Sequence, residues 1–410
     1  MTVPALDAID LFDPVHLDDP YPLYHRLRAE SPVYRIPGSD FYLVTSWDLV
    51  TEAVSRVEDF SSHLTGALLR QPGQPPATFD MDGGGQAIHV LATADDPSHQ
   101  AQRKLVQPLL AKRIRGLGPT AADLVDRLWQ EELRGDRIEW AAGVADRLPL
   151  ALVADIIGLP DADVPQLLTW AYDSTEMLGG IVEADRFGQL AAAAADLAGY
   201  LYTKVQAALT DPVDDSPTDL LGVLAAACRS GEITAPVAVL VLVQLVGAGG
   251  ESTAGLIANA ARLLALDPAL QDELRREPAL LPAFLDEALR LESPFRGHHR
   301  HVTADTTLGG TMIPAGSHVL LSWGAANRDP ARFDRPDTLD LDRRSGANNL
   351  AFGRGIHFCI GSALAKLEAT AALTALLERT TEFTLVEDAP PQWFPSIFVR
   401  RHRSLPLRVR

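Results

Sequence analysis

The sequence predicts a mainly α-helical protein in which one large helical domain carries small β-sheets. Apolar residues recur at three- and four-residue spacing along much of the chain, which is the period of an amphipathic helix. Alanine is frequent within these stretches and has the highest intrinsic helix propensity. Segments with the composition of strands are few and short, and most lie near the two ends of the chain.

The helical pattern extends in order over 21–30, 98–117, 120–134, 145–157, 188–210, 233–266, 282–291 and 363–378. The range 233–266 is long and apolar, but Gln244, Glu251 and Arg262 interrupt it. A membrane span needs about 20 mostly uninterrupted apolar residues. We therefore expect a long helix buried in the protein, and no part of the chain is expected to lie in a membrane.

Strands are expected at 33–35, 41–45, 317–322, 383–385 and 405–409. Gly- and Pro-rich ranges fall at 71–85 and 211–217. Neither range has the sustained low complexity of a linker, and the chain has no internal repeat. These patterns predict that residues 1–410 form a single domain.

Composition excludes several classes of protein. The 410 residues include 36 Lys and Arg against 54 Asp and Glu, a formal charge of −18, which argues against nucleic-acid binding. Hydrophobic residues make up 47% of the chain, as in ordinary globular proteins. The two cysteines, Cys228 and Cys359, are too few for a disulfide framework, which indicates a reducing, cytoplasmic location.

The most specific segment is 352–361, with the sequence FGRGIHFCIG. Its glycines allow a tight loop and the close approach of a flat ligand. The loop delivers Cys359 to the start of the helix expected at 363–378, where free N–H groups favour a thiolate. A single thiolate is a suitable ligand for haem iron. Cys228 has no such surroundings and is expected to be an inert buried thiol.

This segment resembles the haem-binding motif F-G-x-G-x-H-x-C-x-G of the cytochrome P450 family at every fixed position. The resemblance implies a cytochrome P450 fold that binds haem b (heme b), with Cys359 as the axial ligand of its iron. It also implies that Phe352 packs beside the thiolate, that His357 is directed at a haem propionate, and that Gly361 belongs to the residues that bind the cofactor.

Other matches follow in the order the family requires. His99 and Arg103 resemble its H-x-x-x-R motif, and four-residue spacing puts both on one helix face, where the resemblance implies that they bind a propionate. Arg300 matches a further propionate-binding arginine, and His298 is a candidate for an added hydrogen bond. The E-x-x-R motif is similar to 287–290 and the D-P-x-x-F-x-x-P motif to 329–336, with a structural role implied for Glu287, Arg290 and Arg343.

The segment 248–253, AGGEST, resembles the family pattern [AG]-G-x-[DE]-T-[TS] in the middle of the long helix. The resemblance implies that Ala248 faces the haem and that Glu251 and Ser252 are the catalytic acid–alcohol pair that delivers protons. Serine replaces the usual threonine, which keeps the hydroxyl but loses the methyl that stiffens χ1. We expect proton delivery to survive with looser coupling of electrons to product.

The same residues are also compatible with other functions. The same Ser252 resembles the nucleophile elbow of a serine hydrolase, although Ala254 stands where a glycine is needed. A haem-binding sensor would use the same thiolate. Within the family, oxidative coupling or peroxide-driven oxidation without oxygen insertion is the alternative to hydroxylation.

The chain resembles the soluble bacterial members of the family. This resemblance implies a monomer that receives electrons from a ferredoxin and a ferredoxin reductase. The expected substrate is an apolar, mid-sized small molecule. Candidate docking residues form a basic patch of Lys104, Lys112, Arg113, Arg115, Arg344 and Arg354. Arg296 is a candidate for an anionic group of the substrate, for a propionate or for solvent. Candidate substrate contacts are Leu68, Leu69, Phe79, Met81, Met177, Leu178, Phe295, Ile397 and Phe398.

Overall fold

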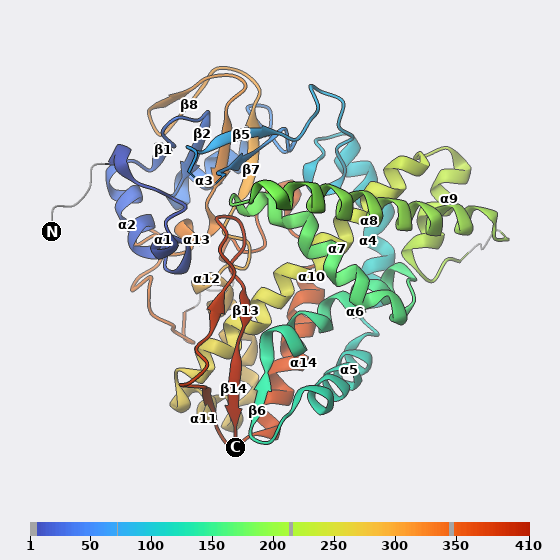
Figure 1. Ribbon diagram of the computed structural model, residues 1–410, viewed down its shortest axis with the longest axis vertical. Helices are drawn as coiled ribbons and strands as arrows, with labels where there is room; N and C mark the ends of the chain where they lie inside the picture. Colours follow the sequence, from blue (N-terminus) through green and yellow to red (C-terminus); the bar gives the residue numbers. More distant parts are fainter. Residues whose placement is uncertain (1–5, 72, 213–215, 344–347) are drawn as a thin grey trace.

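Helices dominate the computed structural model, which describes residues 6–410 except 72, 213–215 and 344–347. The prediction of a mainly helical fold with small sheets is confirmed (Figure 1). The α-helices are α1 (Pro14–Asp18), α2 (Tyr21–Glu30), α3 (Trp47–Ser55), α4 (Ser98–Ile114), α5 (Gly118–Glu132), α6 (Arg147–Ile157), α7 (Val164–Glu176), α8 (Ala184–Thr210), α9 (Leu220–Ser230), α10 (Ala235–Ala265), α11 (Pro268–Arg276), α12 (Leu281–Leu291), α13 (Trp323–Ala326) and α14 (Ser362–Arg379). Short turns of other helix types are η1 (Leu6–Ala8), η2 (Leu91–Thr93), η3 (Ala141–Ala145), η4 (Asp161–Asp163), η5 (Met177–Gly179), η6 (Pro278–Leu280) and η8 (Gly355–His357).

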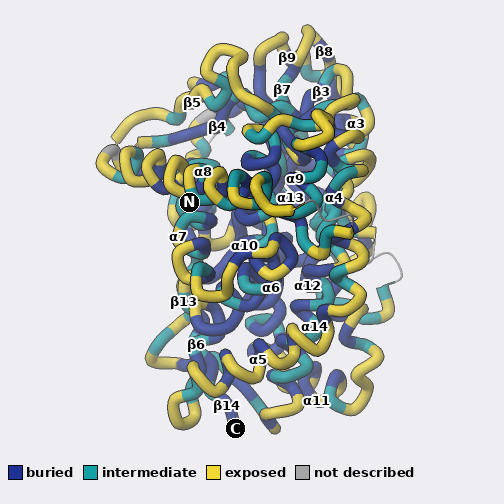
Figure 2. The backbone as a smooth tube through the Cα atoms, turned by 90° about the vertical axis from the view of Figure 1, so that its right-hand side faces the viewer, coloured by how far each residue is buried: buried dark blue, intermediate teal, exposed yellow. Residues whose placement is uncertain are grey.

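Helix α10 is the centre of the structure. It packs against α6, α8 and α14, and Figure 2 shows it running through the interior of the molecule. By length and composition alone α10 could cross a membrane, but 56% of its most apolar window is buried inside the protein. Asp267 follows soon after the end of α10 and starts the next helix. Its side chain accepts a hydrogen bond from Leu270 N and so caps the N-terminus of α11. The observed helix therefore matches the buried helix expected at 233–266.

The largest sheet has five strands in the order β1-β2-β10-β7-β3. Its strands are β1 (Val33–Arg35), β2 (Phe41–Val44), β3 (Phe60–Ser61), β7 (His298–Val302) and β10 (His318–Leu321). Strand β10 pairs parallel with β2 and antiparallel with β7, which places Leu321 opposite His298. Gly297 makes this approach possible, because a Cβ there would lie 2.4 Å from the carbonyl oxygen of Leu321. His298 and Arg300, two residues apart on β7, point to the same face.

Smaller sheets flank the helices. Strands β11 (Phe383–Leu385), β14 (Pro406–Val409) and β6 (Arg137–Glu139) form a three-stranded sheet. The remaining strands form three pairs: β4 (Gly66–Leu69) with β5 (Ala77–Asp80), β8 (Thr306–Leu308) with β9 (Thr311–Ile313), and β12 (Gln392–Trp393) with β13 (His402–Ser404). Strand β5 lies within the Gly- and Pro-rich range 71–85.

A buried ion-pair cluster braces the chain before the cysteine loop. Arg290 Nε lies 2.7 Å from Glu287 Oε1, and Arg343 Nε lies 3.2 Å from the same oxygen. Arg290 also donates to the carbonyl oxygens of Asn327 and Thr338, at 3.2 and 3.0 Å. The expected pairing of Glu287, Arg290 and Arg343 is confirmed.

Candidate functional site

A cavity lies between α10 and the loop that carries Cys359. Its walls include Cys359 on the loop and Ala248 and Ser252 on α10. It is also lined by all the other residues that were predicted to bind the cofactor: His99, Arg103, His298, Arg300, Phe352, His357 and Gly361. Glu251 does not line the cavity.

The loop holds the cysteine by backbone geometry. Gly353 and Gly355 have φ angles of 67° and 72°, a left-handed conformation that favours glycine. Cys359 N donates to Phe352 O at 2.9 Å. Burial raises the pKa of the Cys359 thiol, while hydrogen bonds from the backbone N–H groups of Gly361 and Ser362 act in the opposite direction. These N–H groups belong to the start of α14, so the sulfur sits where an anionic ligand atom is stabilised.

Cationic and imidazole groups gather at another part of the cavity. Arg300 is 7% exposed, and its Nη1 donates to His299 O at 2.7 Å. Burial lowers the pKa of the Arg300 guanidinium to about 10. Among the described residues no carboxylate forms an ion pair with Arg300. A buried guanidinium without a paired anion requires an anionic partner for full stabilisation.

Two histidines line the same cavity as Arg300. The rings of His99 and His357 have centroids 4.1 Å apart, and His357 Nε2 lies 2.9 Å from Ser62 Oγ. His99 Nδ1 lies 3.2 Å from Asp96 Oδ1, and Arg103 Nη1 donates to Ile356 O at 3.2 Å. Burial, followed by the charge of Arg300, lowers the pKa of His357 to about 3.

The donor set fits haem b. One cysteine sulfur is held by backbone N–H groups at a cavity wall, as an iron ligand requires. The buried Arg300, with His99, Arg103 and His357 nearby, supplies donors for the carboxylates of such a group. Ala248, a small residue on α10, leaves room beside the loop for a flat ring.

His298 contributes a further polar atom to the cavity wall. Trp323 Nε1 donates to His298 Nδ1 at 2.8 Å. Sequence reasoning singled out His298 but missed Trp323, because β7 and α13 meet only through the register of the sheet.

Glu251 is turned away from the cavity into a buried network. Its Oε1 lies 2.6 Å from Arg401 Nε, and its Oε2 accepts from Thr175 Oγ1 at 2.5 Å. The Arg401 guanidinium also stacks over the ring of Tyr172, whose hydroxyl donates to Asp146 Oδ1 at 2.7 Å. Burial raises the pKa of Asp146 to about 6. Arg401, Tyr172 and Asp146 had no signal in the sequence, because they lie far from the motif.

Ser252 lines the cavity and donates from Oγ to Ala248 O at 2.8 Å. Both residues lie within the continuous helix α10. A nucleophile elbow requires a sharp turn between a strand and a helix. The interpretation of Ser252 as a hydrolase nucleophile is therefore wrong.

Several other expectations need correction. Arg296 is buried, donates to Leu17 O and does not line the cavity. Arg113 is engaged with Asp155 Oδ2 at 2.6 Å, which weakens its candidacy for docking. Cys228 is half-buried rather than buried, and burial raises the pKa of its thiol. Arg344 lies outside the described residues.

The candidate substrate contacts are largely packing residues. Phe295 lines the cavity, whereas Leu68 and Ile397 belong to one apolar cluster and Leu69 and Met177 to another. Phe398 and Leu178 pack with Phe295, outside the set of cavity-lining residues. Phe79 packs against Phe187, with ring centroids 5.3 Å apart, and Met81 is half-buried outside the cavity.

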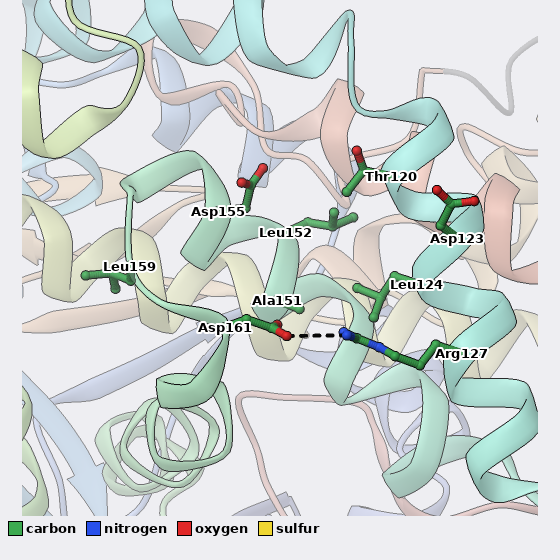
Figure 3. Close-up of a pocket in the computed structure, with 9 residues that line it drawn as sticks. All are labelled: Thr120, Asp123, Leu124, Arg127, Ala151, Leu152, Asp155, Leu159 and Asp161. Atoms are coloured by element: carbon green, nitrogen blue, oxygen red, sulfur yellow. Dashed lines mark hydrogen bonds and ion pairs between the residues drawn. The ribbon is translucent and has the colours of Figure 1, made fainter.

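A second hollow lies at the surface between α5, α6 and η4 (Figure 3). Its side chains include Asp123, Asp155 and Asp161, and Figure 3 marks the ion pair of Asp161 with Arg127, at 3.3 Å. Asp155 pairs with Arg113. Because two of its three carboxylates already pair with arginines, we interpret this hollow as ordinary solvent-exposed surface.

The helical fold and the cysteine cavity define a haem–thiolate protein. The cytochrome P450 family model matches residues 184–403. The chain is 48% identical to cytochrome P450 144 of Mycobacterium tuberculosis, over 100% of this chain and 93% of that protein. It is 30% identical to 6-deoxyerythronolide B hydroxylase of Saccharopolyspora erythraea, over 100% and 99% of the two chains. The structure of CYP109E1 from Bacillus megaterium in complex with testosterone matches with a TM-score of 0.84 and 29% identity, over 96% of this chain and 99% of that one.

This chain belongs to the cytochrome P450 family. It is an oxidoreductase of the monooxygenase type, and the cofactor of the family is haem with a cysteine thiolate as the axial ligand of the iron. One of its relatives is named as a hydroxylase, which favours an enzyme over a haem sensor.

Proposed function

We propose that this chain hydroxylates a mid-sized, apolar small molecule in the cavity between α10 and the Cys359 loop. The observation that carries the proposal is one cavity that combines a backbone-stabilised cysteine sulfur with the small and hydroxyl side chains of Ala248 and Ser252. We infer that Cys359 is the axial ligand. His99, Arg103, His298, Arg300 and His357 would bind the propionates, while Phe352, Ala248 and Gly361 would pack against the ring.

When bound, a thiolate-ligated haem supplies the electron density that favours O–O cleavage. The protein's task is then to deliver protons to the reacting group in the cavity. We assign this task to Glu251 and Ser252. Ser252 Oγ lines the cavity and can exchange its bond to Ala248 O for one to a reacting group. Glu251, one residue away, holds its carboxylate in the Arg401 network, from which protons would reach Ser252.

The substrate class is inferred from the walls. Leu91, Leu245, Pro294 and Phe295 make the cavity apolar, and Gln244 is tied to Ala92 N at 2.8 Å. Apolar walls with few polar groups suit a hydrophobic ligand. A hydroxylase and a testosterone complex among the similar proteins support this class.

We propose a ferredoxin, reduced by a ferredoxin reductase, as electron donor to a cytoplasmic, single-domain monomer. Exposed Ile356 (43%) and Phe358 (45%) precede the cysteine on its loop, and the nearby Arg354 is also exposed. Exposed apolar side chains next to a basic one are typical of an interaction surface. Lys104, Lys112 and Arg115 on and after α4 complete the docking candidates.

The cheapest test is the absorbance spectrum of the reduced protein under carbon monoxide. We expect the red-shifted Soret band of thiolate ligation, and its loss in Cys359→Ser with haem still bound. An unchanged band in Cys359→Ser would contradict the assignment. A ligand screen that follows the spin-state shift of the haem would then identify substrates. Product analysis with ferredoxin and reductase separates hydroxylation from coupling and from peroxide-driven oxidation.

A further inference from the structure

His298 and Trp323 form a hydrogen-bonded pair at the cavity wall. Trp323 is 2% exposed and begins α13, where Ser322 Oγ accepts from Ala325 N and fixes the helix start. The close approach at Gly297 brings β7 against the end of β10, two residues before Trp323. Backbone packing and the helix cap thus place the two side chains next to each other.

The chemistry of the indole determines the proton position on the imidazole. An indole N–H is a donor and cannot accept. His298 Nδ1 must therefore accept from Trp323 Nε1, at 2.8 Å, and carry no proton. The remaining proton of the neutral ring lies on Nε2. Burial, with the charges of Arg300, His299 and His357, lowers the pKa of His298 to about 3, which agrees with a neutral ring.

The residue that carries the free donor lines the cavity beside cationic and imidazole groups. His298 lines that cavity together with Arg300 and His357, and its Nε2 makes no hydrogen bond within the described part of the chain. The rings of Phe295 and Phe398 pack on it in edge-to-face contacts, with centroids 5.4 and 5.8 Å away. A fixed N–H next to an arginine is suited to a carboxylate oxygen.

We propose that Trp323 is a positioning residue, which locks His298 as the Nε2–H tautomer so that His298 presents one permanent N–H donor to a carboxylate in the cavity. The proposal rests on the proposed function, in which this cavity holds haem. The carboxylate belongs either to a haem propionate or to the substrate.

The tautomer is tested directly by ¹⁵N NMR of imidazole-labelled holoprotein in its diamagnetic, reduced carbon monoxide form. His298→Gln assigns the resonances. We expect a deprotonated Nδ1 and a protonated Nε2 in the wild type, and mixed or inverted tautomers in Trp323→Phe. Trp140→Phe is the matched control, because Trp140 is fully buried and its Nε1 has no hydrogen-bond partner among the described residues. A wild type with protonated Nδ1, or an unchanged tautomer in Trp323→Phe, would overturn the proposal.

The carboxylate is tested by the rate of haem transfer to excess apomyoglobin. Loss of a charge-assisted hydrogen bond predicts about tenfold faster transfer in His298→Phe, with partial rescue in His298→Gln, which retains an N–H donor. Trp323→Phe should show a smaller increase and Trp140→Phe none. Reconstitution with iron protoporphyrin dimethyl ester, which lacks free carboxylates, should abolish the His298→Phe effect if the acceptor is a propionate.

The second possible acceptor, a substrate carboxylate, is tested by the binding of dodecanoate and dodecanol, which is followed by the spin-state shift of the haem. If the acceptor is a substrate carboxylate, His298→Phe should weaken the binding of dodecanoate by about tenfold and leave the binding of dodecanol unchanged. If neither haem transfer nor dodecanoate binding changes, the proposal is wrong. Failure of the proposed function is distinguishable, since it would remove the thiolate Soret band while the NMR measurement still reports on His298.

Discussion

Glu251 and Arg401 form a buried ion pair that joins the middle of α10 to the start of the β13 segment, with Nε and Oε1 2.6 Å apart. The two side chains are 2% and 8% exposed. Arg401 is further held between the rings of Tyr172 and Phe394, at 4.3 and 4.2 Å from their centroids. The acid proposed for proton delivery is therefore oriented by a residue 150 positions later in the chain.

Removal of Arg401 should destabilise the protein strongly. Arg401→Gln leaves the Glu251 carboxylate buried without its partner, which costs about 3–5 kcal/mol in comparable buried pairs. The free energy of unfolding of the haem-loaded protein in urea measures this loss. Arg410→Gln is the control, because Arg410 pairs with Glu382 at the surface and should cost less than about 1 kcal/mol. Equal losses in the two variants would show that the Glu251–Arg401 pair contributes no more than a surface pair.

Asp146 should make stability fall as pH rises from about 4 to 6. Its pKa is raised from 3.8 to about 6, so in this interval the folded state binds more protons than the unfolded state. Asp146→Asn retains an acceptor for the Tyr172 hydroxyl and should be more stable than wild type above pH 6, by up to about 3 kcal/mol. The difference should shrink below pH 6 and vanish near pH 4. Urea unfolding as a function of pH measures it, and a difference independent of pH would contradict the ionisation of Asp146.

Ser252 should couple electrons to product less tightly than threonine. Its hydroxyl is bonded to Ala248 O, and without a Cβ methyl its χ1 rotamer is free to change. With substrate, ferredoxin and reductase, Ser252→Thr should release less hydrogen peroxide per electron, and Ser252→Ala more. Equal peroxide ratios in wild type and Ser252→Thr would exclude the idea.

Charge reversal beside the cysteine loop should slow electron transfer. Arg354→Glu should lower the rate of the first electron transfer from reduced ferredoxin by about tenfold at low salt, and the difference should shrink as salt screens the charges. Stopped-flow measurement at two salt concentrations tests this. Arg134→Glu, an exposed position between α5 and β6 outside the proposed patch, serves as the control. A similar slowing in both variants would indicate a general charge effect.

Much of the fold was predictable where the hydrophobic periodicity is strong or where residues typical of helix and strand ends mark a boundary. The range 21–30 matches α2, and 383–385 matches β11, at both ends. The helices α3, α7 and α11 were missed, and so was β7. Strand β7, with the sequence HHRHV, carries no alternation of apolar and polar residues, and only pairing with β10 makes it a strand.

The site divides in the same way. Cys359, Arg300 and Ser252 lie in local motifs, and the fold brings them to one cavity as expected. Trp323 and Arg401 act through contacts with residues far away in sequence, and no local pattern marks them. Spacing along the chain predicts which side chains share a helix face, but it does not predict which distant strands pair.

The walls of the Cys359 cavity come from segments as far apart as Leu91 and Ala365. Bringing them together costs loop-closure entropy before any contact across the cavity compensates for it. A molecule that binds only the finished arrangement shifts the folding equilibrium toward it. The prosthetic group is thus also a folding ligand for this chain. Cells starved of iron or porphyrin should accumulate less intact protein, even at an unchanged rate of synthesis.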